Sequence, residues 1–131
     1  VTAEKIDRLL AQSSGLAQEF GVSQDVVRYL ARRRGEDAFA VLQTMEKTGD
    51  ALENMWNAEA RFSLNHEMCF NLVDFYWRRS PLFLFHADHG ARYLRSLAGI
   101  FASRLGWSDS QKQEQISHLE AQIAHETRSL R

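Results

Sequence analysis

Apolar residues recur at spacings of three and four along nearly the whole chain. This is the period of an amphipathic helix, and the alternating runs of Val, Ile and Thr that mark strands are absent. The only proline is Pro81, and several of the seven glycines stand where an apolar pattern stops. A chain of 131 residues suits one domain. We therefore predict an all-α fold, a single helical bundle of five to six helices over residues 1–131, with no sheet.

The helix ends are marked by capping residues. Ser23 is placed to cap the third helix, which we expect to stop at Gly35, and Ser108 to Gln111 fits a capping box. Asp50 to Asn57 is a connector whose secondary structure the pattern leaves open. The helical pattern is present in residues 3–12, 15–20, 24–34, 36–47, 58–79, 88–105 and 109–129, of which 15–20 is the shortest stretch.

The predicted helix 58–79 carries an apolar stripe and a polar stripe, and it should end at Ser80 because Pro81 disfavours helical geometry there. The polar stripe is either a solvated face or a network that fixes how the helix meets a neighbour, and the apolar surroundings favour the network. The apolar stripe comprises Leu64, Met68, Leu72, Phe75 and Tyr76, widened by Cys69 and Val73; the polar stripe comprises Ser63, Glu67, Asn71, Asp74 and Arg78.

Residues 16–34 have the pattern of a helix-turn-helix, with Gly21 at the turn. In a DNA-binding protein the start of the second helix, with Gln24, Asp25 and Arg28, would face base edges. A plain helical corner explains the same pattern, and Asp25 would face phosphate charge. A small transcription regulator with a helical sensor region is thus the alternative function.

Two groups of residues contain metal-binding side chains, namely His86 to His89 and His66 with Glu67 and Cys69. Neither group has a familiar zinc spacing, so we predict no metal site. Dinucleotide, phosphate-loop and nucleophile-elbow motifs are also absent from the sequence. A single cysteine excludes a disulfide framework and favours a reducing compartment, which points to the cytoplasm.

The net charge of −1 argues against a nucleic-acid partner and against a polybasic membrane anchor. No apolar run approaches the roughly 20 residues of a transmembrane helix. The chain starts at Val1 without an initiator methionine, which processing of the N-terminus and excision from a longer chain explain equally well.

The segment from His66 to Ser80 resembles a helix in the C-terminal domain of FAD-dependent glycerol-3-phosphate dehydrogenases and alpha-glycerophosphate oxidases. The family pattern is Ala-Glu, His-Glu, Leu-x-Asp and Arg-Arg followed by Thr or Ser. The corresponding residues here are Ala58-Glu59, His66-Glu67, Leu72-Val73-Asp74 and Arg78-Arg79-Ser80, and Leu105-Gly106-Trp107 also matches. The resemblance covers residues 16–123. One departure is Arg34 before Gly35, where the family often has Tyr.

The resemblance implies a parent enzyme that oxidises glycerol 3-phosphate to dihydroxyacetone phosphate, reducing FAD and then quinone or oxygen. The FAD and substrate sites would lie in an N-terminal domain, on which this helical domain packs as a cap. The parent would be cytoplasmic or peripheral on the inner face of the membrane, and homodimerisation stays open. No residue here is expected to be catalytic or to bind cofactor or metal. Glu67, Asp74, Arg78 and Arg79 are expected to be structural or interface residues.

Overall fold

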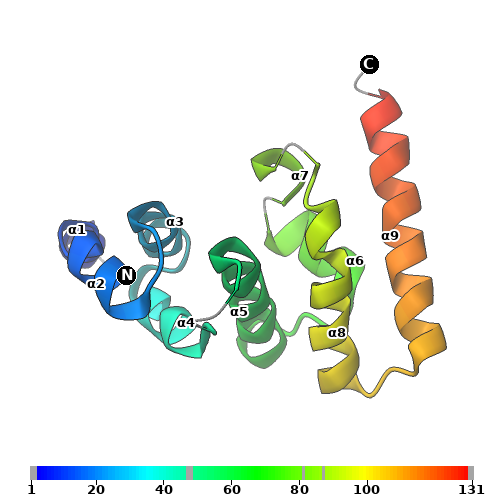
Figure 1. The fold of residues 1–131 in the computed structure, drawn as a ribbon, viewed down its shortest axis with the longest axis horizontal. Coiled ribbons are helices and arrows are strands. Elements are labelled where there is room, and N and C mark those ends of the chain that lie inside the picture. Colours follow the sequence, from blue (N-terminus) through cyan, green and yellow to red (C-terminus); the bar gives the residue numbers. More distant parts are fainter. Residues whose placement is uncertain (1–2, 47–48, 81, 87, 130–131) are drawn as a thin grey trace. The chain divides into compact units, whose positions relative to one another are not determined.

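The computed structural model describes residues 3–46, 49–80, 82–86 and 88–129, and all but five of their side chains (residues 5, 6, 9, 84 and 85). These residues form helices and turns without a strand, which confirms the all-α prediction (Figure 1). Six of the described helices have eight residues or more: α1 (Ala3–Ala11), α2 (Ser13–Phe20), α3 (Gln24–Arg34), α5 (Ala51–His66), α8 (Leu94–Leu105) and α9 (Asp109–Ser129).

The chain divides into two compact units, Val1–Glu59 and Ala60–Arg131, so the boundary falls inside α5. That the whole chain behaves as one domain stays a prediction. In the first unit, α3 contacts α1, α2 and the short helix α4 (Ala38–Thr44). Its buried residues Val26, Val27, Leu30 and Ala31 form the centre of that core.

The predicted caps of α3 are confirmed. The Ser23 hydroxyl accepts a hydrogen bond from the Val26 backbone N–H at 3.3 Å, and Gly35 ends the helix. The next predicted helix, 36–47, is shorter: a 3-10 turn (Gly35–Asp37) precedes α4, which ends at Thr44. Val41 and Leu42 are buried on α4, whereas 41% of Phe39 is exposed, with its ring nearly perpendicular to that of Phe20.

In the connector 50–57, residues 51–57 are helical. The Asp50 carboxylate accepts a hydrogen bond from the Leu52 backbone N–H at 2.9 Å and so caps the start of α5. The prediction of one continuous helix over residues 58–79 is wrong. The segment is divided into α5, a non-helical segment, the short α6 (Leu72–Asp74) and a π-helical turn, η2 (Phe75–Arg79). Ser80 is extended, as the following Pro81 predicts.

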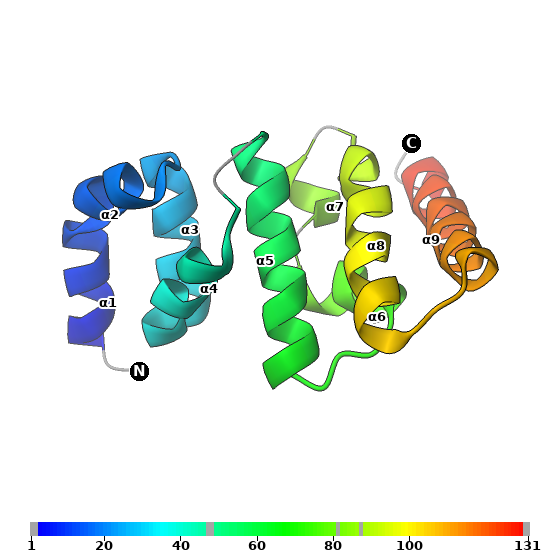
Figure 2. The ribbon, with the colours of Figure 1, turned by 60° about the horizontal axis from the view of Figure 1, so that its bottom comes forward.

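In the second unit, α8 and α9 pack side by side and α6 contacts both (Figure 2). The predicted helix 88–105 starts later, because a short helix α7 (Leu82–Phe85) and a 3-10 turn η3 (Ala91–Tyr93) precede α8. Gly106 ends α8 in the left-handed conformation. The predicted capping box is confirmed: Gln111 N–H donates to the Ser108 hydroxyl, and Ser108 N–H donates to the Gln111 side chain.

Helix α9 is polar on most of its surface and buries only Ile116, Leu119 and Ile123. The core of the second unit is rich in aromatic and leucine side chains, with Leu72, Phe75, Tyr76, Leu97 and Phe101 fully buried. No helix among the described residues is both long and apolar enough to cross a bilayer.

Candidate functional site

Residues 67–71, the α5–α6 loop, interrupt the segment that carries most of the family-like motif. Met68 adopts a left-handed backbone conformation with φ of 52°. Asn71 is extended, and its side-chain oxygen accepts a hydrogen bond from the Asp74 backbone N–H at 2.7 Å. Asn is a strong N-cap residue and offers the backbone an alternative to a continuous helix. The loop therefore follows from a local capping signal that the helical periodicity concealed.

The loop places its apolar side chains on opposite sides. Cys69 is fully buried, whereas 78% of Met68 and 56% of Phe70 are exposed. Met68 was expected to lie in the apolar stripe, and that prediction is wrong because the helical period ends before it. Leu64, Leu72, Phe75 and Tyr76 are buried as expected, and Val73 is half-buried.

Glu67 joins the loop to α5. Its carboxylate accepts a hydrogen bond from the buried Ser63 hydroxyl at 2.8 Å. The Ser63 carbonyl in turn accepts from the backbone N–H groups of Glu67 and Cys69, at 3.0 and 3.4 Å. These contacts suit a structural role for Glu67, which stays a prediction.

Asp74 contacts both matched arginines. Arg78 Nε lies 3.6 Å from one carboxylate oxygen of Asp74, and Arg79 Nε lies 3.7 Å from the other. Asp74 and Arg78 form an i,i+4 pair, but the Arg78 side chain is 81% exposed, so this pair adds little stability. The five polar residues do not share one helix face, because the helix that would align them is broken.

The surroundings of Cys69 favour the neutral thiol over the thiolate. Burial, followed by the neighbouring Asp74 carboxylate, raises the pKa of its thiol from 9.0 to about 11. Since the thiolate is the reactive form, this cysteine is unsuited to nucleophilic catalysis near neutral pH. A buried cysteine of this kind acts as a small apolar core residue.

A buried ion pair in the first unit was not predicted. The Arg34 guanidinium binds the Glu59 carboxylate in a bidentate manner, with Nε 3.2 and 3.1 Å from the two oxygens. Glu59 is 0% exposed and the Arg34 side chain 6% exposed, while Arg33 Nε lies 3.6 Å from Glu59. Glu59 stood in the family-like pattern and Arg34 was a departure from it. Their contact could not be predicted, because the two residues lie 25 positions apart in the sequence.

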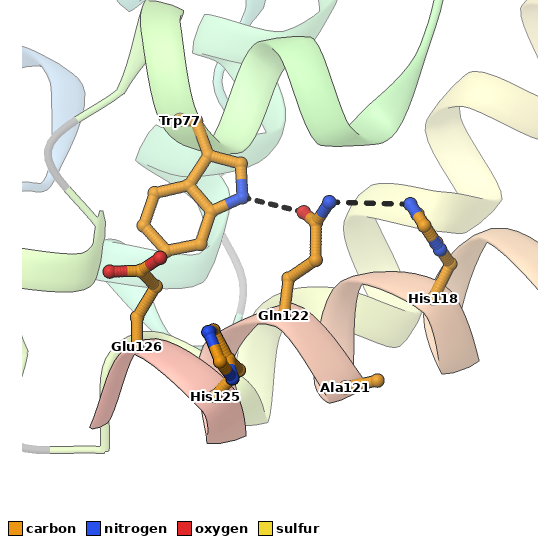
Figure 3. Close-up of a pocket in the computed structure, with 6 residues that line it drawn as sticks. All are labelled: Trp77, His118, Ala121, Gln122, His125 and Glu126. Atoms are coloured by element: carbon orange, nitrogen blue, oxygen red, sulfur yellow. Dashed lines mark hydrogen bonds between the residues drawn. The ribbon is translucent and has the colours of Figure 1, made fainter. Parts of the chain in front are cut away.

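An open groove of about 690 Å³ lies between Trp77 and one face of α9 (Figure 3). The Trp77 indole N–H donates to the Gln122 side-chain oxygen at 2.9 Å, and the Gln122 nitrogen is 3.3 Å from His118 Nε2. His118 and His125 are both exposed. The groove contains imidazoles and one carboxylate, on Glu126, but no convergent charged cluster.

The histidine and aspartate of the segment 86–89 serve the turn itself. His89 Nδ1 lies 2.7 Å from the Phe83 carbonyl oxygen, and its ring stacks on Phe83. The Asp88 carboxylate accepts from the backbone N–H groups of Gly90 and Arg92, and these bonds outweigh partial burial and lower its pKa. Among the residues that the structure describes, no three potential ligands converge on a metal position.

The helix-turn-helix corner is present as α2, Gly21 and α3. Gln24, which would meet base edges in a DNA-binding unit, donates to the Ser13 hydroxyl at 3.0 Å. Asp25 and Arg28 contact each other at 3.4 Å. The corner is therefore used for packing within the first unit.

Comparison with known proteins gives concordant results. Residues 3–112 match the family model of the C-terminal domain of alpha-glycerophosphate oxidase. Aerobic glycerol-3-phosphate dehydrogenase of Staphylococcus epidermidis is 26% identical over 124 residues, and that of Staphylococcus aureus is 27% identical over 124 residues. The corresponding Staphylococcus saprophyticus enzyme is 23% identical over 120 residues.

These alignments cover 92%, 92% and 89% of this chain but 22% of each relative, so the chain spans about a fifth of the length of the curated relatives it matches. The comparisons give no support to the regulator alternative. The family match takes in α1 to α8 and the capping box before α9. The chain belongs to the family of C-terminal domains of alpha-glycerophosphate oxidases, within which it is similar to aerobic glycerol-3-phosphate dehydrogenases.

Proposed function

We propose that residues 1–131 are the non-catalytic, helical C-terminal domain of an FAD-dependent glycerol-3-phosphate dehydrogenase. The observation that carries this proposal is the family match over residues 3–112, in a chain that covers 22% of its dehydrogenase relatives. The parent enzyme would oxidise the secondary alcohol of glycerol 3-phosphate to the ketone of dihydroxyacetone phosphate. In that reaction the carbon transfers hydride to FAD and the hydroxyl loses a proton.

The residues present here do not fit an FAD site. The seven glycines include no Gly-x-Gly-x-x-Gly run, which in flavoproteins brings the backbone close to the pyrophosphate. The groove beside Trp77 is lined by Glu126, whose carboxylate would repel a pyrophosphate, and by no arginine or lysine. We therefore assign FAD and substrate to the remaining part of the parent chain and derive no catalytic step through residues 1–131.

The chemistry of the matched polar residues supports a structural role. Glu67 is bonded to Ser63, and Asp74 contacts the Arg78 and Arg79 side chains. Groups engaged with one another in this way hold the turn between α5 and η2. We place the parent in the cytoplasm, peripheral on the inner face of the membrane, where its reduced flavin would pass electrons to quinone.

The test uses the complete protein that carries residues 1–131. We expect flavin to be released on denaturation and an artificial electron acceptor to be reduced only when glycerol 3-phosphate is added. Glu67→Gln and Arg79→Ala should leave kcat within about threefold of the wild-type value, because neither side chain touches the reacting atoms. A complete protein without flavin, or a loss of kcat of a hundredfold or more in either variant with the fold intact, would contradict the proposal.

A further inference from the structure

The α5–α6 loop exposes more large apolar surface than any other short segment that the structure describes. Three large apolar residues are markedly exposed in the described part of the chain, namely Phe39, Met68 and Phe70. Met68 and Phe70 both belong to the loop, whereas the Phe39 ring packs nearly perpendicular to the Phe20 ring. Exposed apolar surface that is gathered in one segment, rather than scattered singly, is typical of interaction sites.

The loop is held in one conformation by its own hydrogen bonds. Ser63 and Glu67 join its first residue to α5, and the Cys69 N–H donates to the Ser63 carbonyl. Asn71 fixes its last residue through the cap on α6. Met68 has a positive φ of 52°, which a non-glycine residue adopts only when its surroundings require it. The molecule thus presents Met68 and Phe70 outward at a cost in backbone strain.

The charges around the loop argue for a protein partner rather than a lipid surface. The loop itself, residues 67–71, contains no lysine or arginine and carries one carboxylate, Glu67. The arginines beside it contact polar groups of the same segment: Arg104 Nε donates to Asn65 at 3.2 Å, and Arg78 and Arg79 lie 3.6 and 3.7 Å from Asp74. Recruitment to an anionic membrane depends on lysine and arginine near the inserted residues, each contributing about 1 kcal/mol. The loop supplies none of its own.

The size of the patch argues for a partner on the same polypeptide. Two side chains cannot bury the roughly 800 Å² per partner that a free-standing protein complex needs. A covalent link supplies an effective concentration of the order of millimolar, so a small patch is sufficient for docking. The relatives offer such a partner, because 22% of each is aligned with this chain and the rest lies outside the alignment.

We propose that the α5–α6 loop is the surface by which this domain docks on the remaining part of the parent chain, with Met68 and Phe70 inserted into an apolar pocket there. This inference rests on the proposed function and assigns the docking surface within it. Methionine suits such a position because its unbranched, polarisable side chain adapts to irregular cavities. Glu67 and Asn71 act as positioning residues, since they hold the loop without entering the pocket.

Methionine oxidation in the complete protein tests the proposal. The three methionines of this segment form a matched set: Met55 is 0% exposed, Met45 is 6% exposed and Met68 is 78% exposed in the domain alone. Hydroxyl-radical footprinting with peptide mass spectrometry gives a rate for each, in the native protein and in urea. We expect all three to oxidise at least about tenfold more slowly in the native protein. If Met68 oxidises within about threefold of its rate in urea while Met45 and Met55 stay protected, the proposal is wrong.

A pair of variants separates docking from folding. Phe70→Asp should restore fast oxidation of Met68, and the exposed control Ala124→Asp on α9 should not. Cys69 should stay slow to alkylate in both, because it is buried beneath the loop independently of any partner. Unchanged protection of Met68 in Phe70→Asp would overturn the proposal.

Other occupants give different results. Protection of Met68 that appears only with added phosphatidylglycerol vesicles would replace the protein partner by a lipid surface, and protection that disappears on dilution would replace it by a second copy. Both outcomes overturn the proposal. Flavin content and glycerol 3-phosphate oxidation, measured on the same samples, keep the two proposals apart: a flavoenzyme with a reactive Met68 refutes the docking surface alone.

Discussion

Removing the charge of Glu59 should destabilise the first unit more than any substitution at the exposed ion pairs. In Glu59→Gln the side chain keeps its size but loses its negative charge. The Arg34 guanidinium would then keep its positive charge at 6% exposure without the carboxylate that it contacts through two nitrogens. Taking one partner from a buried pair leaves an uncompensated charge in a medium of low polarity.

The expected loss of unfolding free energy is about 3 kcal/mol, the lower end of the 3–5 kcal/mol observed when buried pairs are broken. The lower end applies because the amide oxygen of Gln can still accept a hydrogen bond. For a chain of this size that loss corresponds to a fall in Tm of roughly 10 °C. The exposed pair between Arg78 and Asp74 gives the matched control, for which Arg78→Ala should cost less than about 1 kcal/mol.

The assay is urea unfolding followed by far-UV circular dichroism, with the double variant Arg34→Met/Glu59→Gln completing a thermodynamic cycle. The double variant should be more stable than Glu59→Gln alone, because no buried charge remains. A loss below about 1 kcal/mol in Glu59→Gln would refute the argument that the pair is buried and coupled. A loss in the double variant equal to the sum of the losses in the two single variants would refute it as well.

Three further predictions concern the second unit. Asp74→Ala should reduce the free energy of unfolding by about 1 kcal/mol, which lowers the melting temperature by a few degrees. The effect of Arg78→Ala should be smaller, because that variant loses one exposed contact. Equal melting temperatures for Asp74→Ala and wild type would show that Asp74 holds no network. The Cys69 thiol has a pKa raised to about 11, so it should alkylate about a hundredfold more slowly at pH 8 than an unfolded cysteine. Its contribution to stability should be lost as pH rises from about 9 to 11, because the thiol of the unfolded chain ionises first. An alkylation rate equal to that of the urea-unfolded chain would contradict this. Gly90→Ala should cost about 1–3 kcal/mol in urea unfolding because Gly90 has φ of 80° and an added Cβ would lie 2.9 Å from Leu82 Cδ2; a change below 0.5 kcal/mol would mean that the turn relaxes freely.

The candidate site shows where sequence patterns stop being informative. The motif residues Glu67 and Asp74 could be identified from the resemblance, but their surroundings could not. Periodicity predicted a helix through them, because apolar residues continue at helical spacing on both sides of the loop. Asn71 was the available signal, since it is a preferred N-cap residue, and its side chain does cap α6.

Fold class and most helix ends were determined by the sequence itself, because they depend on contacts between residues three or four positions apart. Ser23, Gly35 and Gly106 end or begin helices as their types predict, and Ser108 with Gln111 forms the predicted box. Only the tertiary structure decided the bidentate contact of Arg34 with Glu59 and the groove where Trp77 meets Gln122, which lies 45 residues further along the chain. Such contacts depend on how helices pack, and the packing direction of a polar side chain is not encoded in its immediate neighbours. The exposure of Met68 belongs to the same class, because a left-handed residue at the end of α5 turns its side chain away from the core that periodicity had assigned to it.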